Sequence, residues 1–247
     1  MAGHNKWSKI KRKKGVNDAR RSKVWTKILK EVAIAVKELG PDPDSNPRLR
    51  LALNNAKGVN MPKDNIQRAI SKASEAGGAN YTELTYEGYA AGGIAVFVEC
   101  TTDNLNRTVQ NIRMYFSKYG GSLGTNGSLA FLFDRKGIFV VPQGNRNEDD
   151  FTMEMIDAGA EDVELEDGVF TVTTAFEDFG AFQKKLEELE IEAESAELQR
   201  IPKSETAVQT DTAKKVIKLI DALEEDDDVQ AVYHNMEMTE ELENAIN

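Results

Sequence analysis

Residues 162–174 read DVELEDGVFTVTT, and this pattern predicts the topology of the region around it. Two runs of β-type residues, 162–166 and 169–174, flank the pair Asp167-Gly168. An Asp-Gly pair between two such runs is a strong signal for a two-residue β-hairpin. We therefore predict two antiparallel strands joined by a tight turn.

The segments on either side of this hairpin carry further strand and helix patterns. Residues 137–141 and 192–201 have the pattern of strands, and residues 151–158 and 176–189 have that of helices. The order strand, helix, strand, strand, helix, strand is that of a ferredoxin-like unit. We predict such a domain over residues 131–205.

Residues 1–78 have the pattern of a small helical domain that begins with a basic arm. Apolar residues recur every three or four positions from Val24 to Leu39, which is typical of an amphipathic helix, and Gly40-Pro41 ends it. Asn46 with Pro47 supplies an N-cap and a first-turn proline for a second helix that ends near residue 58. A third helix begins at residues 61–62. We predict a three-helix domain with a basic exterior.

The rest of the chain predicts a third domain built from two separate segments. Residues 84–89 and 94–100 are typical of strands, residues 104–119 of a helix, and a further strand-like run covers 129–133. Near the C-terminus, one helix (213–223) and one strand (229–234) are too little to form a core alone. We place them on the earlier segment, which gives a discontinuous middle domain over 79–130 and 206–247. The fold class is therefore α+β, with the ferredoxin-like unit inserted in the middle domain.

Charge is divided unequally along the chain. Residues 1–72 contain 18 basic and 6 acidic side chains, a net charge of +12, whereas the whole chain carries −11. Residues 73–247 therefore carry −23. Clustered Lys and Arg favour a polyanion, and nucleic acid is the leading candidate because phosphate contacts release counterions. The acidic remainder would be repelled, so we expect the contact to be local.

Several classes of protein are disfavoured by the sequence. No apolar run suits a signal peptide or a membrane span, and a single cysteine, Cys100, allows no internal disulfide, so we expect a cytoplasmic protein. No zinc ligand set or nucleophile dyad is visible. We predict a non-enzymatic protein without metal or cofactor.

The candidate phosphate contacts begin in the basic arm and continue into the first helix. Trp7 could stack on an exposed base or anchor the arm in the helical domain, and packing is the more usual role for a lone tryptophan. If five to eight phosphates are neutralised, log K should fall with log salt at a slope of about −4 to −7. The candidates are Lys6, Trp7, Lys9, Lys11, Arg12, Lys13, Lys14, Arg20, Arg21, Lys23 and Lys27.

The second and third helices form a candidate helix-turn-helix motif. Lys63 and Arg68, with Asn65 and Gln67, would then face a groove of the nucleic acid. The alternative is a helical bundle with a polar, solvated surface.

A second candidate site lies where a predicted strand becomes a helix, at residues 103–108. Either Asp103 or Asn104 is a good N-cap, and Arg107 could hold either a phosphate or an acidic neighbour in a two-pronged contact. The sequence does not decide between these two partners of Arg107.

Glycines at 121, 124 and 127 give a loop that lacks the residues of a nucleotide-binding motif. Gly124 could allow close approach to a nucleic-acid backbone, and a plain flexible connector is the alternative. The acidic run at 224–228 lacks the spacing of a calcium loop, so we expect a solvated turn between a helix and a strand.

Seven short motifs follow one another along the whole chain: AGHNKW (2–7), DPDSNP (42–47), NMP (60–62), YEGY (86–89), TDNLNRT (102–108), GGSLG (120–124) and VYHN (232–235). In this order they resemble the YebC/PmpR family. That resemblance implies the three-domain architecture and a probable DNA-binding transcriptional regulator. The family's mitochondrial branch implies the alternative of a translational activator, a ribosome-associated factor that binds ribosomal RNA.

Overall fold

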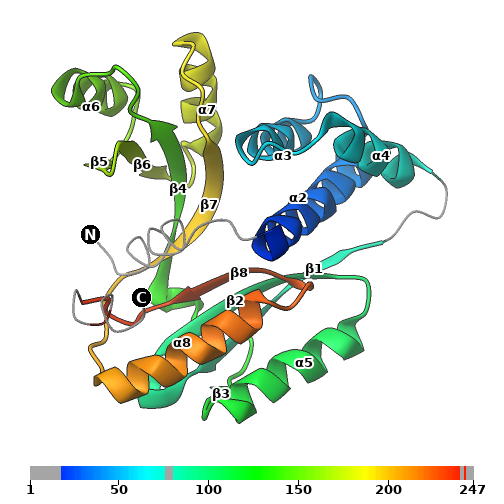
Figure 1. Cartoon of the computed structure of the whole chain (residues 1–247), viewed down its shortest axis with the longest axis vertical. Coiled ribbons are helices and arrows are strands. Elements are labelled where there is room, and N and C mark those ends of the chain that lie inside the picture. Colours follow the sequence, from blue (N-terminus) through cyan, green and yellow to red (C-terminus); the bar gives the residue numbers. More distant parts are fainter. Residues whose placement is uncertain (1–17, 76–79, 240–241, 243–247) are drawn as a thin grey trace. The chain divides into compact units, whose positions relative to one another are not determined.

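The structure, a computed structural model, describes residues 18–75, 80–239 and 242 (Figure 1). The chain packs into two compact units. Of the described residues, the first unit comprises 18–30, 80–134, 201–239 and 242, and the second comprises 31–75 and 135–200. The helix α2 (Asp18–Leu39) therefore begins in the first unit and ends in the second.

The first unit contains a four-stranded sheet in the order β3 (Ser122–Leu123), β1 (Thr82–Tyr89), β2 (Ala95–Thr102) and β8 (Val229–His234). All three neighbouring pairs are antiparallel. The C-terminal strand therefore returns to the sheet of β1 and β2, as the sequence predicted.

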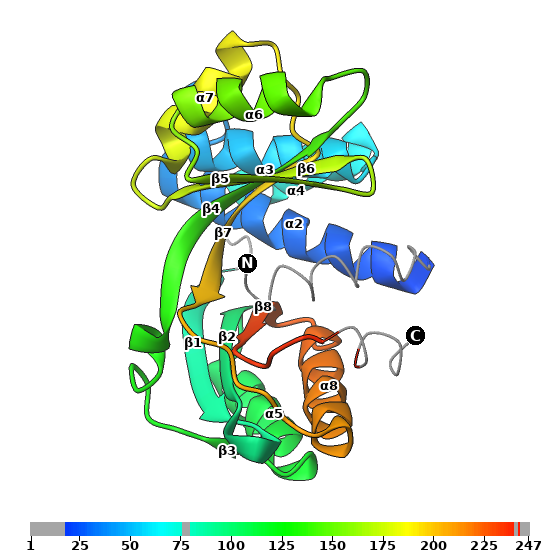
Figure 2. The same ribbon diagram turned by 90° about the vertical axis from the view of Figure 1, so that its left-hand side faces the viewer.

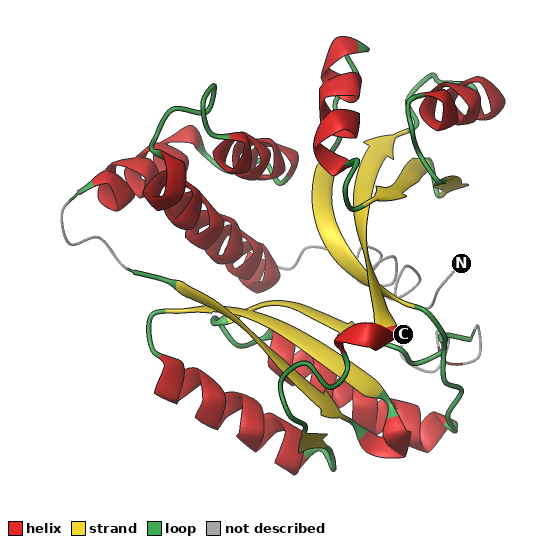
Figure 3. Ribbon diagram, turned by 180° about the vertical axis from the view of Figure 1, so that it is seen from behind, coloured by secondary structure: helices red, strands yellow, loops and turns green. Residues whose placement is uncertain are grey.

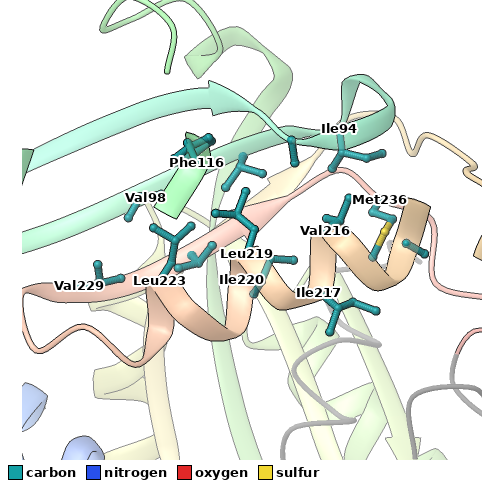
Figure 4. Packing of buried hydrophobic residues seen from close by; sticks show 14 of the residues in the cluster. Ile94, Val98, Phe116, Val216, Ile217, Leu219, Ile220, Leu223, Val229 and Met236 are labelled. Atoms are coloured by element: carbon teal, nitrogen blue, oxygen red, sulfur yellow. The ribbon is translucent and has the colours of Figure 1, made fainter. Parts of the chain in front are cut away.

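Two helices, α5 (Leu105–Lys118) and α8 (Thr210–Glu224), cover one face of this sheet (Figure 2). Their apolar faces and alternate residues of β2 form the largest buried cluster in the first unit. Figure 4 shows α8 lying along the sheet with Val216, Leu219 and Leu223 directed at the strands. Members of this cluster include Ile94, Val98, Phe116, Val216, Ile217, Leu219, Ile220, Leu223, Val229 and Met236.

The opposite face of the sheet carries a smaller apolar cluster. Ala95 and Phe97 of β2 pack there with Tyr233 of β8. Leu129 and Phe133, from the chain that follows β3, cover them. Successive strand residues point to opposite faces, which explains why Phe97 and its neighbour Val98 belong to different clusters.

The second unit contains a sheet in the order β5 (Asp162–Glu166), β6 (Val169–Ala175), β4 (Phe133–Pro142) and β7 (Ser195–Pro202). With α6 (Glu148–Asp157) and α7 (Phe179–Glu188), the chain order is strand, helix, strand, strand, helix, strand. Strand order and connectivity confirm the predicted ferredoxin-like unit.

The predicted hairpin of this unit is confirmed residue by residue. Glu166 pairs with Val169, and the two turn residues have left-handed φ angles, 50° at Asp167 and 76° at Gly168. This geometry matches the right-handed twist of the strands. Aromatic rings fill the core behind it, with Phe151 and Phe170 stacked at 4.2 Å.

The helices of the second unit are the later part of α2, α3 (Pro47–Gly58) and α4 (Lys63–Ser74), seen together in Figure 3. The predicted N-cap Asn46 is fully buried, and its side chain accepts a hydrogen bond from Leu49 N. The same side chain donates to Ala35 O at 2.7 Å and to Gly40 O at 2.8 Å. One asparagine thus joins the end of α2 to the start of α3.

Within the second unit, α3 also contacts the ferredoxin-like sheet. The Asn55 side chain donates to Ala196 O and accepts from Ala196 N, at 3.0 and 2.9 Å. The α+β fold class is confirmed, and the three predicted domain boundaries stay a prediction.

One predicted strand was wrong. Residues 129–133 form a short 3-10 turn, η2 (Ala130–Leu132), and β4 starts only at Phe133. The third strand of the first sheet is instead β3, inside the glycine-rich stretch. A Cβ at Gly121 would lie 2.6 Å from Tyr89 O, so only glycine lets the chain come this close to the end of β1.

Candidate nucleic-acid interface

The basic arm lies largely outside the described residues. This holds for the predicted contacts Lys6, Trp7, Lys9, Lys11, Arg12, Lys13 and Lys14. Arg20 lies in α2, and its side chain is also outside the description. Arg21 is the first predicted contact whose side chain is described. It is exposed, and its guanidinium lies 5.3 Å from the centre of the Trp25 ring.

Lys23 and Lys27 contact an acidic turn of the first unit, residues 224–228, that joins α8 to β8. The Lys23 ammonium donates to the carbonyl oxygen of Glu225 and lies 3.7 Å from its carboxylate. Lys27 Nζ lies 3.4 Å from Glu224 O and 3.3 Å from Gln230 O. Both predicted phosphate contacts therefore have partners within the chain.

Lys30, one turn further along α2, makes the most buried of these contacts. Its Nζ donates to Asp228 Oδ1 at 3.2 Å and to Asp227 O at 2.7 Å. It also reaches Thr101 O at 3.0 Å. The Lys30 side chain is 11% exposed and that of Asp228 4%, so this ion pair is shielded from water.

Arg107 approaches the same carboxylate from α5. Its Nε lies 3.0 Å from Asp228 Oδ2, and its Nη2 lies 2.8 Å from both carboxylate oxygens. Nη2 also donates to Asp103 Oδ1 at 2.8 Å. Of the two partners that the sequence left open for Arg107, the structure has the acidic neighbour.

The pKa values follow from this geometry. Burial alone would raise the pKa of Asp228, but hydrogen bonds from Arg107, Thr108 and Lys30 lower it below its usual value. The hydrogen bonds to Asp228 and Asp103 raise the pKa of Arg107. Both groups are therefore held in their charged forms.

The acidic run joins α8 to β8 as predicted, and Glu225 and Asp227 are exposed, but two of its carboxylates are buried. Asp226 is 9% exposed and Asp228 3%. Asp226 Oδ2 accepts from Asn111 at 2.9 Å and from the Tyr115 hydroxyl at 3.2 Å. The expectation of solvation was wrong for these two residues, because cations, an amide and hydroxyls 111 to 198 residues away offset the cost of burying their carboxylates.

The cations of α4 have a different environment. Lys63, Arg68 and Lys72 are exposed. Among the described residues, Arg68 donates to nearby groups of its own helix, Asp64 O at 3.1 Å and Asn65 Oδ1 at 2.9 Å. Arg68 and Lys72 are four residues apart and so share one side of the helix.

Asn104 has the predicted capping role: its side chain accepts from Arg107 N at 3.1 Å at the start of α5. Gly124 lies after β3, and its N–H donates to Glu87 O at 2.8 Å.

Sequence reasoning missed five exposed cations on the outer surfaces of α5 and α8. They could have been found from the apolar periodicity of the helices, which assigns the intervening positions to solvent. None forms an ion pair with a residue that the structure describes. The five are Arg113, Lys118, Lys214, Lys215 and Lys218.

The described chain offers little catalytic or metal-binding chemistry. No group of three or more His, Cys, Asp or Glu side chains there could hold a metal ion. Cys100 is buried, and burial raises the pKa of its thiol to about 12, so it stays protonated at neutral pH. No described helix is long and apolar enough to cross a membrane.

The fold and the site together define a class: an α+β protein with cationic N-terminal helices followed by two antiparallel sheets. Sequence profiles narrow this class to one family. The TACO1/YebC protein N-terminal domain matches residues 5–76, and the TACO1/YebC second and third domain matches residues 81–236. The chain belongs to the TACO1/YebC family.

Relatives match over nearly their whole length. A "probable transcriptional regulatory protein" of Amoebophilus asiaticus is 53% identical, with 96% of this chain and 98% of the relative covered. One of Rubrobacter xylanophilus is 49% identical, with 98% of each covered. A crystal structure of a conserved hypothetical protein from Aquifex aeolicus superposes with a TM-score of 0.82 at 44% identity, covering 90% of this chain and 93% of that one.

Proposed function

We propose that the protein is a non-enzymatic regulator of gene expression that binds nucleic acid, with DNA as its target. The observation that carries this proposal is the pair of exposed cations on one side of α4, Arg68 and Lys72, with Lys63 exposed at the start of the same helix. The printed names of the relatives, probable transcriptional regulatory proteins, support the choice of DNA.

In this proposal the helices of the N-terminal region neutralise phosphates, and counterion release drives binding. Arg21, in the first unit, and the predicted contacts of the basic arm are further candidate phosphate contacts. Lys23, Lys27 and Arg107 contribute to the fold of the first unit instead, because their charges are already matched by internal carboxylate and carbonyl oxygens. The segment 135–200 has 18 acidic and 6 basic side chains, so it would keep the nucleic acid confined to the cationic surface.

A second candidate is an RNA-binding translation factor. The glycine-rich stretch 120–133 favours it, since it contains no charged residue and exposes an aromatic ring, Phe131. Stacking on aromatic side chains is a common way to bind unpaired bases of RNA.

The decisive experiment is crosslinking in living cells followed by sequencing of the bound DNA and RNA. Recovery of DNA supports the first candidate, and recovery of ribosomal RNA supports the second. In parallel, binding of the pure protein to a duplex DNA and a hairpin RNA should be measured at several salt concentrations. We expect a steep decline with salt, and undetectable or salt-independent binding to both would refute the proposal. Metal-dependent cleavage of either probe would contradict the assignment as a non-enzyme.

A further inference from the structure

The loop between β3 and β4, residues 124–132, has its backbone fixed by one buried side chain. Glu87 of β1 is 2% exposed, although it is a carboxylate. It receives hydrogen bonds from Gly127 N, at 2.8 Å, and from Leu129 N. Its own carbonyl oxygen accepts from Gly124 N at 2.8 Å. Three amides of the loop are therefore bound to a single residue of the sheet.

The hydrogen bonds to Glu87 both stabilise its buried carboxylate and fix the conformation of the loop. Burying a carboxylate away from water is unfavourable, and charge-assisted hydrogen bonds from main-chain amides offset that cost. Gly127 has a φ of 86°, which glycine adopts without strain. Thr85 fixes a further position of the loop, since its hydroxyl donates to Asn126 Oδ1 at 3.3 Å. The buried carboxylate and the glycine together give the loop a defined shape.

The fixed loop presents one aromatic ring to solvent. Leu129 and Phe133 are 1% and 4% exposed and pack on the sheet, whereas Phe131, between them, is 67% exposed. It is the most exposed large apolar side chain in the described chain. The 3-10 turn η2 holds it there, with Leu132 N donating to Leu129 O at 3.0 Å.

The surroundings of Phe131 suit a nucleobase better than a protein surface. A protein-binding patch requires several contiguous apolar side chains, but the exposed neighbours in this loop are glycines, Ala130 and three uncharged polar residues. A base needs one flat apolar surface for its ring and hydrogen-bonding groups for its edge. The polar residues are Thr125, Asn126 and Ser128.

We propose that Phe131 is a stacking platform for an unpaired nucleobase and that the hydroxyl and amide groups of residues 125–128 bind the polar edge of that base. This inference rests on the proposed nucleic-acid binding and adds a second contact, selective for unpaired strands, to the phosphate contacts of the N-terminal helices. Glu87 is a positioning residue, because it acts through the loop backbone.

The test compares the full-length protein and Phe131→Ala on two probes. One is an RNA hairpin with 2-aminopurine in its loop, and the other is a fully paired duplex. Loss of one stacking contact should weaken hairpin binding about tenfold and abolish the fluorescence change of 2-aminopurine. Binding to the duplex should be unchanged. An otherwise identical DNA hairpin shows whether the base must belong to RNA.

Matched variants separate stacking from general damage. Phe131→Trp should keep the hairpin affinity, since it retains a flat ring. Met153→Ala, which removes a 61% exposed side chain from α6 in the second unit, should change the affinity for neither probe. Glu87→Gln keeps the Phe131 side chain but weakens the hydrogen bonds that hold its loop, so it should weaken hairpin binding. Its circular dichroism and its duplex affinity should match those of the wild type.

The outcomes are distinct. Equal hairpin affinity of the wild type and Phe131→Ala, with binding intact, overturns the stacking site and leaves the proposed function standing. An equal loss on both probes also overturns it, because a stacking contact spares the duplex. If the wild type binds no nucleic acid at all, the proposed function fails and the inference fails with it.

Discussion

Two sets of cations on the N-terminal helices resemble each other in the sequence and have different environments in the structure. Lys23, Lys27 and Lys30 of α2 are held by oxygens of residues 224–230 in the first unit. Lys63, Arg68 and Lys72 of α4, in the second unit, are exposed. Local density of positive charge therefore does not by itself identify a phosphate-binding surface. The acceptors that distant parts of the chain provide also decide what a lysine does.

Removing the buried acceptor of the α2 lysines should have the largest effect on stability. We expect Asp228→Ala to lower the free energy of unfolding by about 3–5 kcal/mol, because it leaves Lys30 buried without its carboxylate. Urea unfolding at neutral pH measures this loss. Asp227→Ala, at the exposed neighbouring position, should stay within about 0.5 kcal/mol of the wild type. Equal losses in the two variants would show that the ion pairs of Asp228 contribute little.

Acid should weaken the same interaction without a mutation. The pKa of Asp228 is lowered in the folded state, so its contribution is present above its ordinary value of 3.8 and is lost as the pH falls through the folded value. The wild type should therefore lose stability below about pH 4 more steeply than Asp228→Asn. Parallel pH dependence in urea unfolding of the two proteins would contradict this account.

A pair of identical substitutions compares the two sets of cations directly. Lys30→Met should cost about 1.5–3 kcal/mol of unfolding free energy, because it removes hydrogen bonds from a charged donor to buried acceptors. Lys72→Met, on the exposed surface of α4, should cost less than about 0.5 kcal/mol. Thermal and urea unfolding measure both values. A large loss in Lys72→Met would mean that α4 depends on this lysine for its own stability.

Removing the exposed cations of α4 should have the smallest effect, a moderate loss of affinity for duplex nucleic acid. Arg68→Gln/Lys72→Gln should weaken duplex binding about fivefold to tenfold and reduce the slope of log K against log salt by about two. The matched control, Lys184→Gln/Lys185→Gln on the exposed surface of α7, removes the same charge from the acidic segment. Fluorescence anisotropy at four salt concentrations gives the slopes. Equal slopes for both double variants would remove α4 from the interface.

The features that the sequence predicted well are those set by local chemistry. Asn46 and Asn104 cap their helices as expected, and the Asp167-Gly168 turn fixes the hairpin register. Strand β8 has the predicted bounds, 229–234. These features depend on a few adjacent residues, and propensity and turn geometry are sufficient to identify them.

The features that the sequence could not predict depend on contacts between distant residues. Strand β3 is two residues long and exists because glycines allow two backbones to meet. The burial of Asp226 and Asp228 depends on partners in α2 and α5, more than one hundred residues earlier. Whether Arg107 would meet a carboxylate or a phosphate was open for the same reason. Of the predicted contact residues, Arg21, Lys63 and Arg68 have exposed side chains in the structure.

The distance in sequence between Lys30 and Asp228 has a consequence for how the protein is made. Synthesis proceeds from the N-terminus, so the lysines of α2 leave the ribosomal exit tunnel long before residues 224–228 exist. During that interval the nascent chain carries a cationic segment whose internal counter-charges have not yet been translated. Completion of the first unit must therefore wait until residues 224–234 have been synthesised, and truncation before residue 228 would leave those lysines available to any polyanion nearby.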